Sequence, residues 1–338
     1  MPSPDFEKEL LEAARFDGSV RDVRFSWSYS REHLFRQCRR AYFISCFLSQ
    51  GGWEPLVHPV IRAAYVEKQR ISFRLWLSRT VQNGIAEGLK KALVHPVDSR
   101  HKLFTSVCLR FFSKNLFDLE YSMEHGEYRN DPKRPCIREC LDGQVDRFRE
   151  LRHQAMESFG TAYNTLTSSP LFQELLRLDP IRFRFGDTLL SYPFGQWTVW
   201  FSPGLVFFDG RRFNMLLCSA SASVSGEEEE ARDSALPDPA RVTAALFDLH
   251  VRTIRKGAPP LARLFRFDSA NAALEEIQPA DGLPSLIRSG AEEMFSLIHP
   301  DGSVFFADYP KTTVRGRCAG CQFAGTCRLL DQWEARHC

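Results

Sequence analysis

The residues of this chain best suited to chemistry are three cysteines near its C-terminal end. Cys318, Cys321 and Cys327 stand at C-x2-C-x5-C spacing. Gly320 and Gly325, which lie between them, tolerate the positive φ values that let short turns bring thiolates together. Four thiolates are the usual complement of a cubane iron–sulfur cluster or of a structural zinc ion. The motif therefore predicts a metal centre that takes a fourth ligand from elsewhere.

Cys38 is the candidate for the fourth ligand, although it lies at the other end of the chain. Apolar residues recur at three- and four-residue steps from Leu34 to Phe43, which predicts a helix with Cys38 on its inward face. A metal centre held from both ends would staple the fold. The alternative is a zinc knuckle, with these ligands: Cys318, Cys321, Cys327 and either His337 or Cys338.

The two cysteine segments together carry a family resemblance. Residues 28–43 read S-x-S-x-x-x-x-F-x-x-C-R-R-x-Y-F, and C-x2-C-x5-C follows far downstream. This combination resembles the iron–sulfur branch of the PD-(D/E)XK nuclease superfamily, which includes CRISPR-associated exonucleases and the RecB-like and AddB nuclease domains. The likeness runs from about Phe25 to Leu330. It implies a DNA-acting nuclease domain whose ends are stapled by a [4Fe–4S] cluster on Cys38 and the three C-terminal cysteines.

The resemblance also locates the positions where such nucleases carry catalytic groups, and this chain has different residues there. The family uses an aspartate at the end of one strand and Asp/Glu-x-Lys on the next, which hold a divalent metal ion and orient water. These positions fall on Gly204, Cys218 and Ala220. Glycine and alanine have no functional side chain, and a neutral thiol is a weak ligand for magnesium. The family's active-site histidine falls on Gln82, which cannot transfer protons.

These losses predict a pseudonuclease. The downstream Q-x-x-x-Y signature of the family is also replaced, by Thr243 and Phe247. The alternative is an active metal-dependent nuclease with displaced catalytic residues, for which the sequence offers these candidates: Asp209, Asp248, the run from Glu227 to Glu230, and Lys256. The segment from Asp308 to Lys311 is similar to the family's acidic catalytic motif, but it lies in the extended connection that leads to the C-terminal cysteines. Nucleophile-elbow, P-loop and dinucleotide-binding patterns do not occur in the sequence.

Binding to DNA would depend on local basic patches, because the formal net charge is only +2. Six arginines lie close in sequence to the cluster ligands, and they are either a phosphate-contacting strip or a solvated basic face. They are Arg36, Arg39, Arg40, Arg315, Arg317 and Arg328. The resemblance favours a DNA-binding or scaffold subunit of a DNA-processing or defence complex, with a nuclease, helicase or other subunit as its protein partner. A purely protein-binding scaffold is the other alternative.

The composition and periodicity predict an α/β protein with four regions. Its 338 residues can bury a substantial core, and 43% hydrophobic with 25% charged residues is typical of soluble globular proteins. We expect a mixed β-sheet with flanking helices. With the core and the tail assigned as the resemblance implies, the regions are an N-terminal helix (1–24), a mainly helical region with Cys38 (25–180), a PD-(D/E)XK-like core (181–310) and a cluster-binding tail (311–338).

Individual elements follow from the same patterns. Helices are expected at 4–16, 60–92, 239–256 and 283–297, and strands at 181–185, 197–201, 205–208, 213–218 and 261–267, with a hairpin turn at Asp209-Gly210.

The cysteine usage and the N-terminal sequence bear on location. Ten cysteines are scattered through the chain without the dense spacing of small disulfide-rich secreted domains, which favours reduced thiols in the cytoplasm. The first residues carry no apolar signal core, and the chain has no run of about 18 apolar residues. We therefore expect a cytoplasmic protein with neither export nor a membrane span.

Overall fold

The computed structural model of the chain describes residues 18–54, 57–131, 133–140, 145–177, 183–184, 189–208, 213–219, 236–254, 261–268, 273–314, 318 and 321–337. Several positions singled out from the sequence lie outside these ranges, together with the helix expected at 4–16. They are Asp209, Ala220, Glu227 to Glu230, Lys256, Arg315, Arg317, Gly320 and Cys338.

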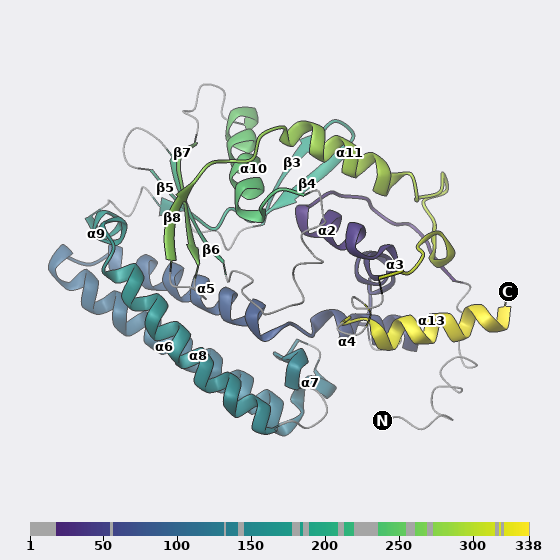
Figure 1. Ribbon diagram of the computed structural model, residues 1–338, viewed down its shortest axis with the longest axis horizontal. Coiled ribbons are helices and arrows are strands. Elements are labelled where there is room, and N and C mark those ends of the chain that lie inside the picture. The colour runs from purple at the N-terminus through teal and green to yellow at the C-terminus, as the bar shows by residue number, and fades with distance from the viewer. Residues whose placement is uncertain are drawn as a thin grey trace.

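The N-terminal half is helical, as expected, and the protein belongs to the mixed α/β class. Its helices are α2 (Tyr29–Gln37), α3 (Arg39–Phe43), a π-helical turn (Ile44–Leu48), α4 (Pro59–Gln69), α5 (Phe73–Leu93), α6 (Val97–His125), α7 (Glu127–Asn130), α8 (Val145–Thr167) and α9 (Pro170–Arg177). Figure 1 shows α6 and α8 as a long antiparallel pair along one side of the molecule.

The helical pattern of residues 60–92 is interrupted, because the chain leaves the helical conformation between α4 and α5. Ile71 makes strand-like backbone bonds instead: its N–H donates to the Cys136 carbonyl and its carbonyl accepts from the Arg138 N–H, at 3.1 and 2.9 Å. Ser72 then caps α5, since its hydroxyl accepts from the Leu75 N–H. A long-range pairing thus replaces one helical turn.

A five-stranded mixed sheet forms the centre of the C-terminal half. Its strands lie in the order β2 (Phe183–Arg184), β5 (Leu205–Phe208), β6 (Phe213–Ser219), β7 (Leu261–Asp268) and β8 (Ala273–Ile277). The β5–β6 pair is antiparallel, with Leu205 opposite Leu216, so the predicted hairpin is confirmed although its turn lies outside the described residues. Helix α10 (Pro239–Ile254) carries the chain from β6 to parallel β7, and β8 returns antiparallel.

The remaining elements lie around this sheet. A separate hairpin joins β3 (Leu190–Phe194) to β4 (Trp197–Phe201), and β1 (Ser19–Val20) pairs with β9 (Val304–Phe305). Helix α11 (Leu283–Phe295) and the C-terminal helix α13 (Ala324–His337) complete the described chain. The sequence did not predict β3, which contains a proline, or β8, which is largely exposed and acidic. Each of these strands is held by backbone pairing with its neighbour, β3 with β4 and β8 with β7.

Alternating strand residues divide the interior into two apolar cores. Val206, Met215 and Leu217 face the first core with α10, α11 and the α2–α4 region. Leu205 and Leu216 face the second core, which α5, α6, α8 and α9 complete. This two-residue alternation is what a sheet covered by helices on both faces requires. The sheet is therefore sandwiched, with α10 on one side and the long helices on the other (Figure 1).

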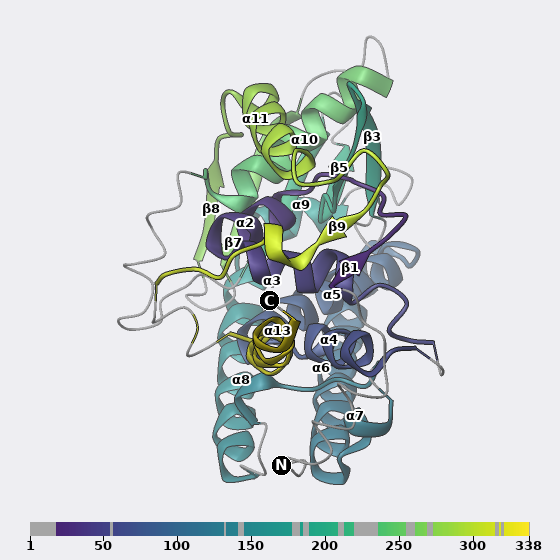
Figure 2. The ribbon, with the colours of Figure 1, turned by 90° about the vertical axis from the view of Figure 1, so that its right-hand side faces the viewer.

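Segments from the two ends of the chain meet on one side of the molecule. Figure 2 shows α13 nearly end-on, beside α4 and below α3. The backbone N–H of Arg40 in α3 donates to the Pro310 carbonyl, and β1 pairs with β9. In the described part of the chain, no helix combines the length and apolar character needed to cross a bilayer.

Candidate functional site

The sequence pattern predicted one continuous helix around Cys38. In the structure, Cys38 lies instead at the junction of α2 and α3. Its backbone is extended, with φ −162° and ψ 111°. Its N–H still donates to the Leu34 carbonyl and closes α2, while its sulfur accepts from the Ala41 N–H at 3.5 Å and caps α3. The side chain is half-buried and packs against the first core. The helix break thus gives the sulfur a defined direction.

Of the C-terminal cysteines, Cys318 and Cys321 precede α13 and Cys327 lies in its first turn. The Cys321 N–H donates to the Cys318 carbonyl at 3.3 Å, and the Cys327 N–H donates to the Phe323 carbonyl at 2.8 Å. Cys321 and Cys327 pack against the first core, as Cys38 does, whereas Cys318 is exposed. Three of the four predicted ligands thus border one core from opposite ends of the chain.

The thiols influence one another electrostatically. Burial raises the pKa of Cys321; a backbone hydrogen bond from Phe323 opposes this, and the neighbouring Cys38 and Cys318 raise it further. Burial likewise raises the pKa of Cys327 to about 11, with a smaller contribution from Cys38. Cys38 therefore lies near enough to Cys321 and Cys327 to influence both thiols. Across the described ranges, however, no three His, Cys, Asp or Glu side chains are spaced as ligands of a single metal ion.

The zinc knuckle with His337 does not fit the C-terminal helix. Cys327 and His337 both belong to α13, ten residues apart, which corresponds to about 15 Å along a helix axis. Zinc ligands each lie about 2.0 to 2.3 Å from one ion, so these two cannot share it while α13 is intact. Cys338 lies outside the described residues.

A polar network surrounds the cysteines and fastens α13. The Arg40 side chain in α3 is buried, and its Nε donates to the Tyr309 carbonyl at 2.7 Å. Its Nη1 lies 3.5 Å from Asp331 of α13, whose other oxygen accepts from Lys311 Nζ at 2.6 Å. Arg40 and Lys311 both lower the pKa of Cys327. They are thus the positive groups that would offset the charge of bound thiolates.

The six arginines predicted to contact nucleic acid have different environments. Arg40 is 4% exposed and offers no surface to a phosphate, so its burial does not fit that prediction. Arg36 forms a salt bridge with Glu32, a buried carboxylate that also accepts from Trp27 Nε1. Arg39 is more accessible, although it pairs with Glu293 at 2.7 Å.

Arg328 on the surface of α13 is exposed, and its Nε donates to the Ala324 carbonyl of its own helix. Arg315 and Arg317 lie outside the described residues. Arg36, Arg39 and Arg328 are therefore the members of the predicted strip that keep an accessible side chain in the described part of the chain, Arg36 and Arg39 within ion pairs.

The structure brings together two of the positions that the resemblance equates with catalytic residues. Gln82 lies on α5 and Gly204 immediately precedes β5, and a Cβ atom built on Gly204 would lie 3.6 Å from Gln82 Nε2. Cys218 lies near the end of β6, beside β5 in the sheet. The alignment through the resemblance thus selected positions that are neighbours in space, although 122 residues separate Gln82 from Gly204 in sequence.

The space for a catalytic carboxylate at Gly204 is filled. Its φ of +67° is a left-handed conformation that L side chains rarely adopt. An added Cβ would lie 2.7 Å from Leu217 Cδ2 and 2.9 Å from the Leu216 carbonyl oxygen. The resemblance predicted that a carboxylate is missing at Gly204, but it gave no sign of Leu217, because ordinary strand alternation does not reveal which neighbour fills the space.

The candidates for a displaced active site have other partners or lie outside the described residues. Asp248 pairs with Arg252 one turn along α10, at 2.8 Å. Asp308 contacts His299 at 3.0 Å. At the family's Q-x-x-x-Y positions, the Thr243 hydroxyl donates to the Pro239 carbonyl and Phe247 is buried. These contacts stabilise α10 and the connection to the cysteines.

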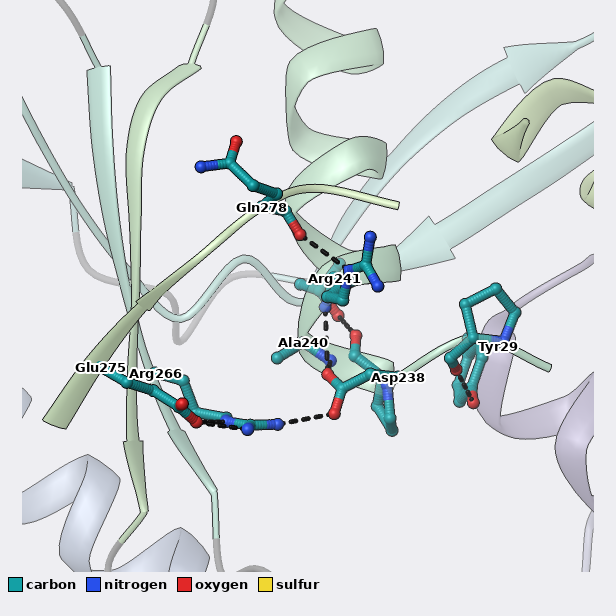
Figure 3. Close-up of polar contacts among 10 residues, drawn as sticks. Tyr29, Asp238, Ala240, Arg241, Arg266, Glu275 and Gln278 are labelled. Carbon is teal, nitrogen blue, oxygen red and sulfur yellow. Dashed lines mark hydrogen bonds and ion pairs between the residues drawn. The ribbon is translucent and has the colours of Figure 1, made fainter. Parts of the chain in front are cut away.

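A carboxylate network beside the sheet, which the sequence did not indicate, is also ion-paired (Figure 3). Asp238 caps α10 by accepting from the Ala240 and Arg241 N–H groups, and its second oxygen accepts from Arg266 Nη1 at 2.6 Å. Arg266 also pairs with Glu275 of β8. Because the guanidinium of Arg266 pairs with both carboxylates and Asp238 also caps α10, the arrangement fits a structural role better than metal binding.

Comparison with known proteins adds no family and no relative. No protein-family model, no curated protein and no solved structure matches the chain. The function must therefore be inferred from the residues and their geometry.

Proposed function

We propose that this protein is a catalytically inactive, nuclease-like protein with a structural [4Fe–4S] cluster, acting as a DNA-binding or scaffold subunit of a DNA-processing or defence complex. The observation that carries the proposal is the pairing of Gln82 with Gly204. These two positions, selected from a family motif, lie together in space. Neither has a group that can bind Mg²⁺ firmly or transfer a proton.

The absence of catalysis follows from the chemistry of these positions. Metal-dependent phosphodiester cleavage needs carboxylate oxygens on the metal ion and a group that orients the attacking water. Gly204 cannot supply a carboxylate, and Leu217 occupies the adjacent space. Gln82 can donate and accept hydrogen bonds, so it can still contact a phosphate or a base without cleaving the strand.

The donor set supports an iron–sulfur cluster at the cysteines. Cys38, Cys321 and Cys327 border the first core, and Cys318 adds an exposed fourth thiol on the same turn. Backbone N–H groups of Ala41 and Phe323 donate to the sulfurs of Cys38 and Cys321, as cluster sulfurs prefer. When bound, the cluster would supply covalent cross-linking between the α2–α3 junction and the segment before α13. A four-cysteine zinc site is the alternative occupant.

Binding of DNA would use a small surface near this staple. Arg39 and Arg328 keep accessible guanidinium groups, and α3 and α13, which carry them, lie on the same side of the molecule (Figure 2). With a net charge of +2, the protein as a whole attracts DNA weakly. We therefore expect salt-sensitive binding that depends on these local charges.

The deciding experiment is anaerobic purification with iron, sulfide and zinc quantified, followed by cleavage assays on single- and double-stranded DNA with Mg²⁺ or Mn²⁺. We expect iron and sulfide in a ratio near one, with no cleavage. Cleavage activity that follows the monomer through gel filtration, and that Asp248→Asn abolishes, would instead establish an active nuclease with displaced ligands. Zinc found without sulfide would show that the cysteines hold a zinc ion and not an iron–sulfur cluster.

DNA binding is tested separately by fluorescence anisotropy over a range of salt concentrations. We expect the affinity to fall as salt rises, and to fall several-fold in an Arg39→Ser/Arg328→Ser variant. Lys91→Ser/Lys102→Ser, two exposed lysines on α5 and α6, is the matched control and should bind as the wild type does. Absence of any salt-sensitive binding would favour a purely protein-binding scaffold.

A further inference from the structure

Glu67 is a buried carboxylate that reaches the cysteine motif from a distant helix. It lies on α4 and is 8% exposed. Its two oxygens accept from the Thr326 N–H at 3.3 and 3.1 Å, across 259 residues of sequence. A second bond comes from the backbone of Gly325. Glu67 therefore holds the first turn of α13, the turn that contains Cys327.

Helix α13 lacks a local residue that could do the same. The first four N–H groups of a helix have no partner within it, and a polar N-cap side chain usually satisfies one of them. The residue before α13 is Phe323, whose side chain has no hydrogen-bond acceptor. The carboxylate of Glu67 fills this role and also complements the positive end of the helix dipole.

Gly325 makes the close approach of the carboxylate geometrically feasible. A Cβ atom at this position would lie 2.3 Å from Glu67 Oε1, far inside van der Waals contact. In the sequence Gly325 indicated a flexible turn, whereas in the structure it lies within α13. Its small size allows the carboxylate to reach the Thr326 amide.

Glu67 also lies next to the ligands themselves. The amide that it accepts from belongs to the residue before Cys327, and Glu67 contributes to the electrostatic environment of Cys321. A buried carboxylate costs free energy unless it is well hydrogen-bonded, so its position beneath the motif needs the amides of α13 as partners. Glu67 and the start of α13 thus stabilise each other.

We propose that Glu67 is a positioning residue that holds the Cys321–Cys327 segment in its ligand-ready conformation before metal binds. This inference rests on the proposed metal centre. It assigns Cys321 and Cys327 to a segment that is anchored on α4 independently of metal, and leaves the approach of Cys38 to the α2–α3 junction.

The test compares the full-length wild type with Glu67→Ala and Glu67→Gln by amide hydrogen exchange of the metal-free proteins. In Glu67→Ala we expect exchange of the segment around Thr326 to become about fivefold faster, the factor that corresponds to a helix cap of about 1 kcal/mol. Glu67→Gln should remain close to wild type, because its amide oxygen can still accept from Thr326. Reconstitution with iron and sulfide should slow in Glu67→Ala by a similar factor.

A second variant covers the case in which Glu67→Ala does not fold. Gly325→Ala keeps the carboxylate but displaces it from the amides, and should speed exchange in the same segment. Gly160→Ala, a helical glycine of α8 whose added Cβ meets nothing within 4 Å, is its control and should leave this segment unchanged.

The outcomes separate the two ideas. Equal exchange and equal iron uptake in the wild type and in the Glu67 and Gly325 variants would overturn the positioning role while leaving the metal centre intact. A wild-type protein that takes up neither iron nor zinc would overturn the metal centre, and the positioning role with it.

Discussion

Gly204 shows how one backbone conformation can exclude a catalytic group. Its left-handed φ suits glycine, and its neighbours Leu216 and Leu217 close the space where a side chain would begin. Returning the family's aspartate to this position would therefore strain the backbone and displace a core leucine. If the proposed function is correct, the missing carboxylate and the closed space go together, and we expect that a single substitution at Gly204 does not build a catalytic site.

We predict that Gly204→Asp, alone or with Cys218→Asp and Ala220→Lys, lowers the free energy of unfolding and restores no cleavage. The expected cost of Gly204→Asp is about 2 to 4 kcal/mol, from the left-handed backbone and from overpacking. Chemical denaturation and a Mg²⁺-dependent cleavage assay provide the measurements.

Gly195→Asp is the matched control for this prediction. Gly195 also has a positive φ, +60°, but an added Cβ would meet nothing within 4 Å. Gly195→Asp should lower the free energy of unfolding by about 1 kcal/mol, which is the contribution of the left-handed backbone alone. Equal destabilisation by the two substitutions would show that Leu217 does not close the site, and cleavage by the Gly204 variants would overturn the argument.

Cys38 is the residue on which the staple depends. We predict that Cys38→Ala removes most of the bound iron and lowers the thermal midpoint, because metal binding contributes directly to folding. Cys140→Ala provides the control, since this thiol is also buried but lies in the second core. It should keep its iron. Iron content and thermal midpoint unchanged in Cys38→Ala would remove Cys38 from the ligand set.

At the scale of elements, α13 is fastened by two helices from the N-terminal third of the chain. Arg40 of α3 reaches Asp331 in its middle, and Glu67 of α4 caps its start. Both contacts are independent of any metal. The cluster would therefore be added to an interface that the protein itself already forms.

The two neighbouring arginines of α3 allow this interface to be tested. We predict that Arg40→Met lowers the free energy of unfolding by about 2 kcal/mol, because the buried Tyr309 carbonyl loses a charged donor. Arg39→Met should cost less than about 1 kcal/mol, since its salt bridge with Glu293 is solvent-exposed. Denaturant unfolding compares them. A larger effect at Arg39 would contradict the burial argument.

At the scale of the whole molecule, the sheet separates two cores that have different relations to the proposed metal centre. Cys38, Cys321 and Cys327 border the first core, together with α2, α3 and α4. The second core is formed by α5, α6, α8 and α9 on the other face of the sheet. A structural cluster should then stabilise one side of the molecule more than the other.

We therefore predict that removing the metal with a chelator speeds amide exchange in α3 and α13 but leaves α5 and α6 nearly unchanged. Exchange measured by mass spectrometry on the metal-bound and metal-free protein resolves the two regions. A uniform increase would mean that the centre stabilises the molecule globally, and no change in α3 or α13 would mean that the metal, if bound, does not staple them.

The sequence by itself determined the class of the fold and most of its elements. The strands at 197–201, 205–208, 213–218 and 261–267 and the helices near 239–256 and 283–297 are confirmed, because their periodicity and turn residues are local signals. It also selected Gln82 and Gly204 as positions of one site through a motif. The spacing of Gln82 and Gly204 in the sequence gave no sign that they lie close together in the structure.

Only the tertiary structure decided what surrounds the selected residues. The break at Cys38, the buried contacts of Arg40, the cap that Glu67 provides and the closure of the site by Leu217 all involve partners distant in sequence or side-chain packing. A hydrogen bond across 259 residues leaves no periodic signal, because it depends on where two helices meet. For this reason the cysteine motif could be read from the chain, whereas the groups that position it could not.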